Sequence, residues 1–495
     1  MTSYYKELEA QLTTYYHLEH LSNIAHWDEA VVMPVGAAES RADALGTLHA
    51  LQHEHLTSNK TQDLLEQAKE DRNLSTHQQT NLDHIEKKII HARAVPTRLV
   101  KALTKASMQS EQQWRQLRAE NNWKAFVPYL DTTFQLTREV NEAKSEQLNL
   151  DPYTILLDNY NPGFSKTDID GVFDQLTSVL PSMIEQITER QSTQSITPLS
   201  GHYSTGQQIS LNTNIMQSLC FNFDHGRIDV SHHPFCGGNP DDTRITTRYD
   251  ESDFLSSLMG TCHETGHAKY EQNLPVAWRN QPAGQAMGMA VHESQSLFVE
   301  MQLCRSEAFF DFLLTKLPTE WLDEEAINSN NLYRIATRVS PSLIRVDADE
   351  VTYPLHVILR YEIEKMLFSG GICIQDLPEY WNSFMKKHLG LSTKNDFRNG
   401  VMQDVHWPSG AFGYFPAYTL GRLIAAQLHE AMEREITHVP DLIRQGNFKP
   451  IFDWLKRHVH CHGQLMNTNE LLKSSTGKAL SAMPFIEHIK RRYLT

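Results

Sequence analysis

The segment His263-Glu264-Thr265-Gly266-His267 is the part of this 495-residue chain from which its fold and its chemistry are best interpreted. Two histidines spaced four residues apart project from the same side of a helix, and Glu264 can reach the space in front of them. Leu255 and Met259 precede the histidines on the same i, i+4 line, so the segment is predicted to be helical. This geometry suits a Zn²⁺ ion held by two imidazoles, with a carboxylate beside a metal-bound water.

Two ordinary buried histidines are the alternative to a metal site. A single histidine on an apolar helix face is more often hydrogen-bonded to its neighbours than bound to an ion. Two histidines with a glutamate between them favour the metal, because an uncompensated buried carboxylate costs several kcal/mol and a divalent cation compensates all three groups.

A catalytic zinc usually takes a third protein ligand and leaves one position for water. Glu271 continues the same helix line, but eight residues place it about 12 Å along the axis from His263, too far to share one ion. Glu293 is the preferred third ligand, on a second predicted helix from about 286 to 310. Breaker residues in 273–284 allow this helix to turn back beside the first.

Glu300 and His292 are weaker candidates for the third ligand. Glu293 on its own is also consistent with an ordinary solvated glutamate, and the preceding H-E-x-x-H pattern is what favours it as a ligand.

Further motifs follow in order along the chain. They are Trp27-Asp28 with Met33-Pro34 and Arg41; His233-Pro234-Phe235; Asp242-Thr243-Arg244-Ile245-Thr246; His292-Glu293-Ser294-Gln295-Ser296; Ile344-Arg345-Val346-Asp347-Ala348-Asp349-Glu350; and Gly400-Val401-Met402-Gln403-Asp404-Val405-His406-Trp407. With these motifs the chain resembles the carboxypeptidase Taq family of zinc metallocarboxypeptidases from about residue 20 to 435. One departure is Val299-Glu300-Met301, where a Trp-Glu-Asn-like run is expected.

The resemblance implies a metal-dependent carboxypeptidase that releases single amino acids from the carboxyl terminus of peptides, and it implies a homodimer. We expect one domain over 1–495, in which the helical region 1–150 covers the active-site groove and 151–495 forms the catalytic core. The resemblance also implies that His233 lines the groove near the terminal residue of the substrate.

Composition excludes several classes of partner. The net charge is −15 and there is no long basic run, which disfavours nucleic acid and anionic membrane surfaces as partners. No window approaches 18 apolar residues, and the amino terminus has no signal-like segment. The six cysteines form no C-x-x-C pair, which is typical of a reduced, cytoplasmic chain.

Periodicity predicts a mainly α-helical chain, which at this length we expect to form a two-lobed body, and the resemblance implies that this body surrounds a long active-site groove. Between about 192 and 249 the pattern changes to alternation and turns, which predicts a small antiparallel sheet just before the zinc helix. The edge of such a sheet could bind an extended peptide, although a purely structural hairpin is an equal alternative. Gly237-Gly238 is expected to be a flexible loop.

The predicted chemistry places His263, His267 and Glu293 on Zn²⁺, for which Co²⁺ can substitute. Glu264 is the expected general base that takes the proton of the activated water and passes it to the leaving amine. The oxyanion needs a second donor, for which Tyr414 and His406 are the candidates. A core aromatic is an equal alternative for Tyr414.

A carboxypeptidase must also bind the free carboxylate that defines its substrate. A guanidinium suits this role because it can grip a carboxylate through two hydrogen bonds. Arg345 is the preferred clamp and Arg244 the second candidate. The alternative is that each is a structural arginine, paired with Asp347 or Asp242.

Two rival functions are consistent with the same motif. An oligopeptidase could use the zinc core to cut internally, and its activity would not depend on a free carboxyl terminus. A zinc-stabilised helical binding scaffold would keep the two histidines but would not need Glu264.

Overall fold

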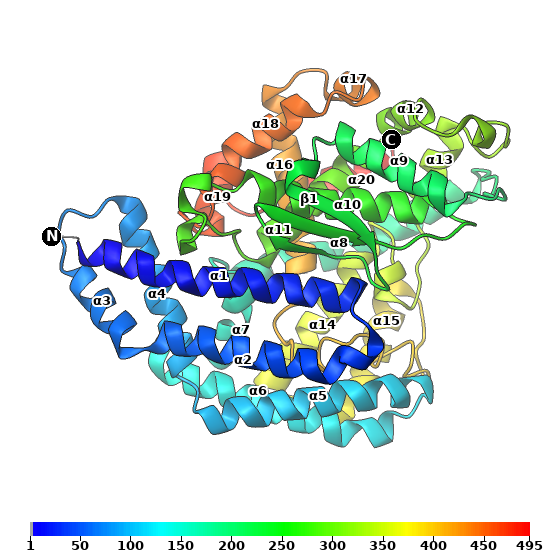
Figure 1. Ribbon diagram of the computed structural model, residues 1–495. Coiled ribbons are helices and arrows are strands. Elements are labelled where there is room, and N and C mark those ends of the chain that lie inside the picture. Colours follow the sequence, from blue (N-terminus) through cyan, green and yellow to red (C-terminus); the bar gives the residue numbers. More distant parts are fainter. Residues whose placement is uncertain (1–2) are drawn as a thin grey trace.

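The computed structural model describes residues 3–495 and is mainly helical (Figure 1). The helices α1–α6 form the blue and cyan side of the molecule, and the green to red remainder lies over them. Their bounds are α1 Tyr4–Val31, α2 Ala38–Thr57, α3 Asn59–Lys69, α4 Thr76–Arg93, α5 Thr97–Ala119 and α6 Trp123–Leu148. The fold therefore has the mainly helical character that the periodicity predicts.

Helix α1 begins where Ser3 caps it, since the Ser3 side chain accepts a hydrogen bond from the Lys6 amide. Its buried residues Leu8 and Leu12 pack with Leu64 of α3 and Ile85 of α4 in a separate hydrophobic cluster. The amino-terminal helices thus have a small core of their own.

Most of the remaining helices, together with parts of α5 and α6, surround one large hydrophobic core, and Ile245 of the sheet packs in a separate small cluster with Met216, Phe221 and Ala268. Their bounds are α7 Pro152–Tyr160, α8 Lys166–Ser192, α9 Thr205–Ser218, β1 Gly226–Val230, β2 Cys236–Asn239, β3 Asp242–Thr247, α10 Phe254–Asn273, α11 Met289–Leu297, α12 Glu307–Leu314, α13 Ser329–Ala336, α14 Tyr353–Phe368, α15 Leu377–Leu389, α16 Pro416–Glu435, α17 Val439–Arg444, α18 Lys449–His458, α19 Thr468–Thr476 and α20 Met483–Tyr493. Helix α10 carries the H-E-x-x-H segment, and α11 with α16 lies beside it.

The helix expected from 286 to 310 is divided. Helix α11 passes directly into a π-helix, Phe298–Cys304. The helical structure then ends and begins again with α12 at Glu307. A π-helical stretch inside a helix is uncommon and often marks a functional position.

The sheet is mixed, which corrects the expected antiparallel sheet. Its order is β1-β3-β2, and only β2 runs antiparallel to β3, whereas β1 runs parallel to it. A tight turn makes β2 and β3 a hairpin, in which the Asn239 side chain accepts from the amides of Asp241 and Asp242. The segment 231–235 leads from β1 at one edge of the sheet to β2 at the other edge. Strand β3 then returns between them and runs parallel to β1.

Gly237 and Gly238 belong to β2 rather than to a flexible loop, contrary to the expectation. Gly238 has a φ of +89°, and a Cβ there would lie 2.0 Å from the carbonyl oxygen of Asp242. No helix within residues 3–495 has both the length and the apolar character needed to cross a membrane.

Candidate active site

Two glycines bring the helices of the site into close contact. A Cβ on Gly266 of α10 would lie 2.4 Å from the carbonyl oxygen of Gln295 in α11. On the other side of α11, a Cβ on Gly421 of α16 would lie 2.7 Å from Cγ of Glu293. Helix α11 is therefore held between α10 and α16 at distances that only glycine allows.

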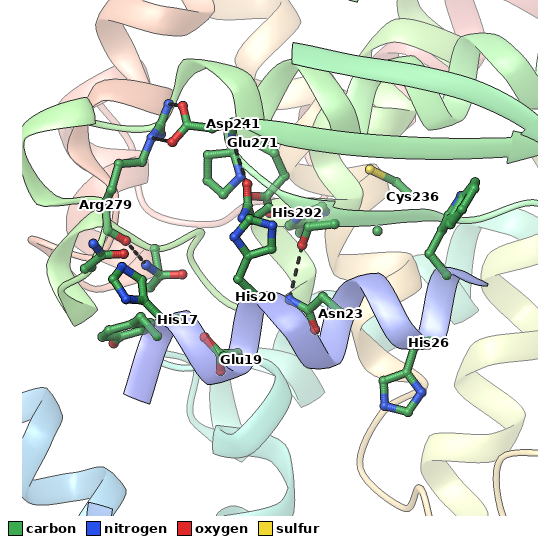
Figure 2. Close-up of a pocket in the computed structure, with 18 of the residues that line it drawn as sticks. His17, Glu19, His20, Asn23, His26, Cys236, Asp241, Glu271, Arg279 and His292 are labelled. Carbon is green, nitrogen blue, oxygen red and sulfur yellow. Dashed lines mark hydrogen bonds and ion pairs between the residues drawn. The ribbon is translucent and has the colours of Figure 1, made fainter. Parts of the chain in front are cut away.

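A cavity of about 440 Å³ opens beside this helix layer, between α1 and β2 (Figure 2). Its lining includes His17 and His20 of α1, and Glu271 and His292 of the helix layer. In Figure 2, His20 points from α1 toward Glu271 and His292. The α1 histidines were not predicted, because helical periodicity places them on a polar face without showing what that face meets.

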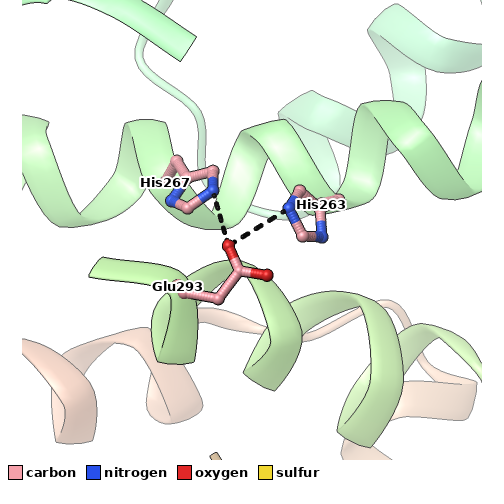
Figure 3. Close-up of side chains that lie close together, drawn as sticks. All are labelled: His263, His267 and Glu293. Carbon is pink, nitrogen blue, oxygen red and sulfur yellow. Dashed lines mark ion pairs between the residues drawn. The ribbon is translucent and has the colours of Figure 1, made fainter. Parts of the chain in front are cut away.

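His263, His267 and Glu293 converge, as predicted (Figure 3). Their potential ligand atoms lie within 4.8 Å of one another. Oε2 of Glu293 is 3.4 Å from Nε2 of His267 and 3.7 Å from Nε2 of His263. Two ligands of a tetrahedral zinc ion lie about 3.4 Å apart when each is about 2.1 Å from the metal. The two nitrogens and one oxygen thus fit a divalent cation.

The second ring nitrogen of each histidine is also held. Nδ1 of His263 lies 2.9 Å from Oε2 of Glu300, whose other oxygen accepts a 2.8 Å bond from Arg305. Such contacts fix the ring orientation and leave the opposite nitrogen free for a metal.

On the other side of the site, Nδ1 of His267 lies 2.7 Å from Nδ1 of His292, and Nε2 of His292 lies 2.8 Å from Glu271. If His267 carries its proton on Nδ1, it donates to His292, which then donates to Glu271. The two weaker ligand candidates, Glu300 and His292, therefore contact the rings of His263 and His267, and Glu271, already excluded by its distance from His263, contacts His292.

The electrostatics of the two rings differ. Burial lowers the pKa of both, but at His263 the carboxylates of Glu293 and Glu300 outweigh burial and raise the pKa to about 9. His267 has one carboxylate and two imidazoles nearby, and its pKa falls to about 4. Two of the site's carboxylates, Glu293 and Glu300, thus act on His263, whereas only Glu293 acts on His267.

Glu264 lies between the two histidines on α10, and one of its carboxylate oxygens forms no hydrogen bond with the described residues. Its side chain is buried, and Oε2 has no hydrogen-bond partner among the described residues. Burial raises the pKa of this carboxyl to about 7. A carboxyl with a pKa near neutrality can both take up and release a proton under ordinary conditions.

Arg345 is buried and paired, although not with Asp347. Its Nε donates a 2.9 Å hydrogen bond to Oδ1 of Asp404, and Nη1 donates to the hydroxyl of Tyr353. The guanidinium also lies 4.9 Å from the ring centre of Tyr418. The partner carboxylate comes from a later motif, which sequence proximity does not indicate.

His406 and Tyr414 lie beside this arginine. Nε2 of His406 is 3.1 Å from the hydroxyl of Tyr418, and the rings of His406 and Tyr414 are 5.4 Å apart. Burial raises the pKa of Tyr414, and the negative charge of Glu293 raises it further. Tyr418 was missed, although its four-residue spacing from Tyr414 is a signal for one shared face.

Arg244 and His233 lie apart from that group, on the sheet side. Arg244 is paired with Asp242 through two hydrogen bonds of 2.9 and 2.8 Å and lies 4.4 Å from the ring centre of Trp27. His233 is exposed, in the segment before β2. The hydrogen bonds and ring contacts of residues 3–495 do not join either residue to Arg345.

The fold and this site define a metallopeptidase. The chain matches the model of the carboxypeptidase Taq (M32) metallopeptidase family over residues 7–493, and it belongs to this family. The resemblance found in the motifs is thereby confirmed.

Relatives of known name are similar to this chain over nearly its whole length. The chain is 34% identical to thermostable carboxypeptidase 1 of Thermus thermophilus and 32% identical to carboxypeptidase 1 of Bacillus subtilis, with 99% of this chain and 98% of each relative covered. The solved structure of Trypanosoma cruzi metallocarboxypeptidase 1 superposes with a TM-score of 0.97 at 38% identity, covering 99% of both chains. The chain is thus a metallocarboxypeptidase, an enzyme that acts on peptides and requires a divalent metal.

Proposed function

We propose that this enzyme releases single amino acids from the free carboxyl terminus of peptides, with Zn²⁺ held by His263, His267 and Glu293. The observation that supports this proposal is the convergence of three donor atoms within 4.8 Å of one another. The second ring nitrogen of each histidine is held by a neighbouring side chain, Glu300 or His292. Zinc is favoured over other divalent ions because two imidazoles and one carboxylate are a common catalytic zinc ligand set. Co²⁺ is the expected substitute.

Glu264 acts as the general base. When bound, the cation would acidify a water molecule and polarise the carbonyl of the bond to be cleaved. Oε2 of Glu264, which has no hydrogen-bond partner within residues 3–495, accepts the proton of the attacking water and delivers it to the nitrogen of the leaving amino acid. The raised pKa of Glu264 suits both steps, because neither the charged nor the protonated form is strongly favoured.

The substrate carboxylate is bound by Arg345, with His406 beside it. A guanidinium has five N–H donors, so the bonds from Arg345 to Asp404 and Tyr353 leave donors for a ligand. Tyr414 donates its hydroxyl proton to the developing oxyanion, and its raised pKa keeps that proton in place. Arg244 and His233 line the groove on the sheet side.

The broader organisation is part of the same proposal. Residues 1–150 cover the groove, which is supported by the position of α1 against the cavity in Figure 2. The six cysteines are free thiols, which supports a reducing, cytoplasmic location. A homodimer is proposed from the family alone and is tested by the molar mass of the protein in solution.

One experiment tests the function directly. A single peptide is digested in its free and its carboxyl-amidated form, with and without a chelator, and the products are identified by mass spectrometry. We expect stepwise loss of single residues from the free peptide, none from the amidated peptide and none with chelator. Internal fragments, or equal cleavage of both forms, would contradict the proposal.

A further inference from the structure

A second cavity, of about 600 Å³, lies between the π-helix, α13, α16, α17 and α20. We propose that this cavity, called the α20 cavity below, binds a small organic phosphate through Gln302, His429 and Arg491. Its volume is within the range of sites that hold small molecules. It shares no lining residue with the three converging metal-binding side chains or with the group around Arg345. The α20 cavity is therefore separate from the proposed peptide site.

Two buried polar side chains line the α20 cavity and form no hydrogen bond with residues 3–495. Gln302 of the π-helix is 5% exposed, and His429 of α16 is 7% exposed. Oε2 of Glu433 lies 3.6 Å from Nδ1 of His429, which is too long for a hydrogen bond. Buried polar groups in proteins are nearly always paired. The amide and the imidazole therefore have hydrogen-bonding capacity that is available to a group inside the cavity.

Positive charge surrounds these two side chains. Five arginine side chains line the α20 cavity, against two carboxylate side chains, Glu307 and Glu433. Burial lowers the pKa of His429 to about 3, and the positive charges of Arg491 and Arg492 contribute to this shift. The imidazole is thus neutral near pH 7 and lies in a positive field. Such a field favours a negatively charged ligand.

Arg491 is the arginine with donors to spare at this position. Arg492 is held by Glu350 and by the carbonyl of Met301, so it contributes charge. Arg491 donates one bond of 3.3 Å to Glu433, and a guanidinium has five N–H donors. A phosphate has three terminal oxygens and close to two negative charges, so it can accept from a guanidinium, an amide and an imidazole together. A carboxylate has only two oxygens for the same donors.

Another part of the lining is apolar. Ala308 of α12 and Val439, Pro440 and Ile443 of α17 contribute aliphatic carbon, and Tyr333 of α13 contributes an aromatic ring. Inorganic phosphate would leave this surface in contact with water, whereas a ring attached to the phosphate would cover it. The lining therefore fits a phosphate ester with an organic body, of which a nucleoside monophosphate is an example.

The α20 cavity borders the π-helix on the side away from Glu300. Gln302 lines the cavity, and the ring of Phe298 packs against His429 with 5.7 Å between the ring centres. Glu300 is two residues from both Phe298 and Gln302, about half a helical turn, and it contacts His263. A bound phosphate ester would thus contact the helical segment whose other face supports a metal ligand.

Binding is tested by calorimetric titration of the full chain with its metal bound. The probes are adenosine 5′-monophosphate, adenosine, inorganic phosphate and the 5′-carboxylate analogue of adenosine. We expect a Kd below about 1 mM for the monophosphate and binding at least about tenfold weaker for each of the other three. Equal binding of inorganic phosphate would overturn the organic body, and equal binding of the carboxylate would overturn the phosphate. The absence of binding by every probe would overturn the site.

Side-chain variants test the three donors. We expect Arg491→Gln and Gln302→Leu each to weaken binding of the monophosphate about tenfold or more. Arg491 is exposed, so its substitution tests the site without disturbing buried packing, whereas the fold of Gln302→Leu is checked by denaturant unfolding. The matched control is Lys490→Gln, which removes one positive charge from an exposed position of α20 outside the cavity lining and should keep the affinity. Equal weakening by Arg491→Gln and Lys490→Gln would mean that only net charge matters, which contradicts the proposal.

Amide hydrogen exchange locates the ligand. We expect the bound monophosphate to slow exchange in the π-helix, 298–304, and in α20, 483–493, because a ligand stabilises the elements that it contacts. Slower exchange confined to α10 and α11 would place the phosphate at the metal-binding side chains and would overturn the assignment to the α20 cavity.

Discussion

At the scale of single residues, we expect Glu264 to be required for catalysis but not for metal binding. Glu264→Gln keeps the size of the side chain but removes the proton acceptor. Because Oε2 has no hydrogen-bond partner among the described residues, the ligand geometry should be unchanged. We expect hydrolysis to fall by about a hundredfold or more, with metal content equal to that of the wild type.

Metal content is measured by elemental analysis after dialysis, alongside hydrolysis of the free peptide. A variant that retains hydrolysis would exclude Glu264 as the base. A variant that loses its metal would show a structural role in place of the catalytic one.

Glu300 should act on metal affinity, since it holds the ring of His263 from the side away from the metal. Glu300→Gln removes the negative charge that the Nδ1 proton faces and also leaves Arg305 without its carboxylate. We expect metal binding to weaken about tenfold to a hundredfold, measured by competition with a chelator.

Glu307→Gln is the control, because Glu307 is exposed at the start of α12 and makes no contact with His263. Equal metal affinity in both variants would show that metal binding by His263 does not require its hydrogen bond with Glu300.

At the scale of elements, the approach of α10 to α11 depends on Gly266. In Gly266→Ala the new methyl group would meet the backbone of Gln295 and Ser296 at 2.4–2.5 Å, and backbone cannot move aside as a flexible side chain can. We expect a loss of about 2–3 kcal/mol in the free energy of unfolding together with weaker metal binding, because Glu293 is displaced from the two histidines.

Gly260→Ala is the matched control on the same helix. A Cβ there has nothing within 4 Å, so the substitution should be neutral or slightly stabilising. If the two variants behave alike, the helix spacing does not depend on Gly266.

The elements also show how far the sequence could predict this molecule. The helix that carries His263 and His267 and the helix that carries Glu293 follow from local spacing, because helical periodicity determines which side chains share a face. Long-range pairing does not follow from it. Asp347 was considered as the partner of Arg345 only as the alternative to its role as a clamp, and the carboxylate that pairs with it is Asp404, from a later loop.

The sheet shows the same limit. The strands were expected from alternation, yet β1 runs parallel to β3 because the intervening segment crosses to the far edge. The π-helix was also not predicted, since its residues continue the apolar pattern of α11. The contact of α1 with the cavity depends on the packing of two distant parts of the chain, which no local pattern encodes.

At the scale of the whole molecule, Glu350 joins the last helix to the layer that carries the site. Its buried carboxylate accepts hydrogen bonds from His488, Arg492 and Tyr493 of α20, at 2.9, 2.8 and 2.9 Å. Arg492 also donates to the carbonyl of Met301 in the π-helix. The carboxyl-terminal helix is thus anchored through one carboxylate.

Removing this charge should destabilise the fold in a pH-dependent way. Burial raises the pKa of Glu350, but Arg492 and His488 lower it more, and the pKa is held well below its ordinary value of about 4.3. A carboxyl with a lowered pKa contributes stability above its ordinary pKa and loses that contribution as pH falls through the folded value. Glu350→Gln should therefore cost about 3–5 kcal/mol at neutral pH, where Arg492 is left unpaired.

The measurement is the free energy of unfolding by denaturant at pH 7 and at several values below about pH 4. The difference between wild type and Glu350→Gln should shrink as the acid protonates Glu350 in the wild type, whereas the exposed Glu487→Gln on α20 should match the wild type throughout. A constant difference across this range would mean that Glu350 stabilises the molecule by packing alone. A difference that shrinks would show that the charge itself holds α20 against the π-helix beside the metal ligands.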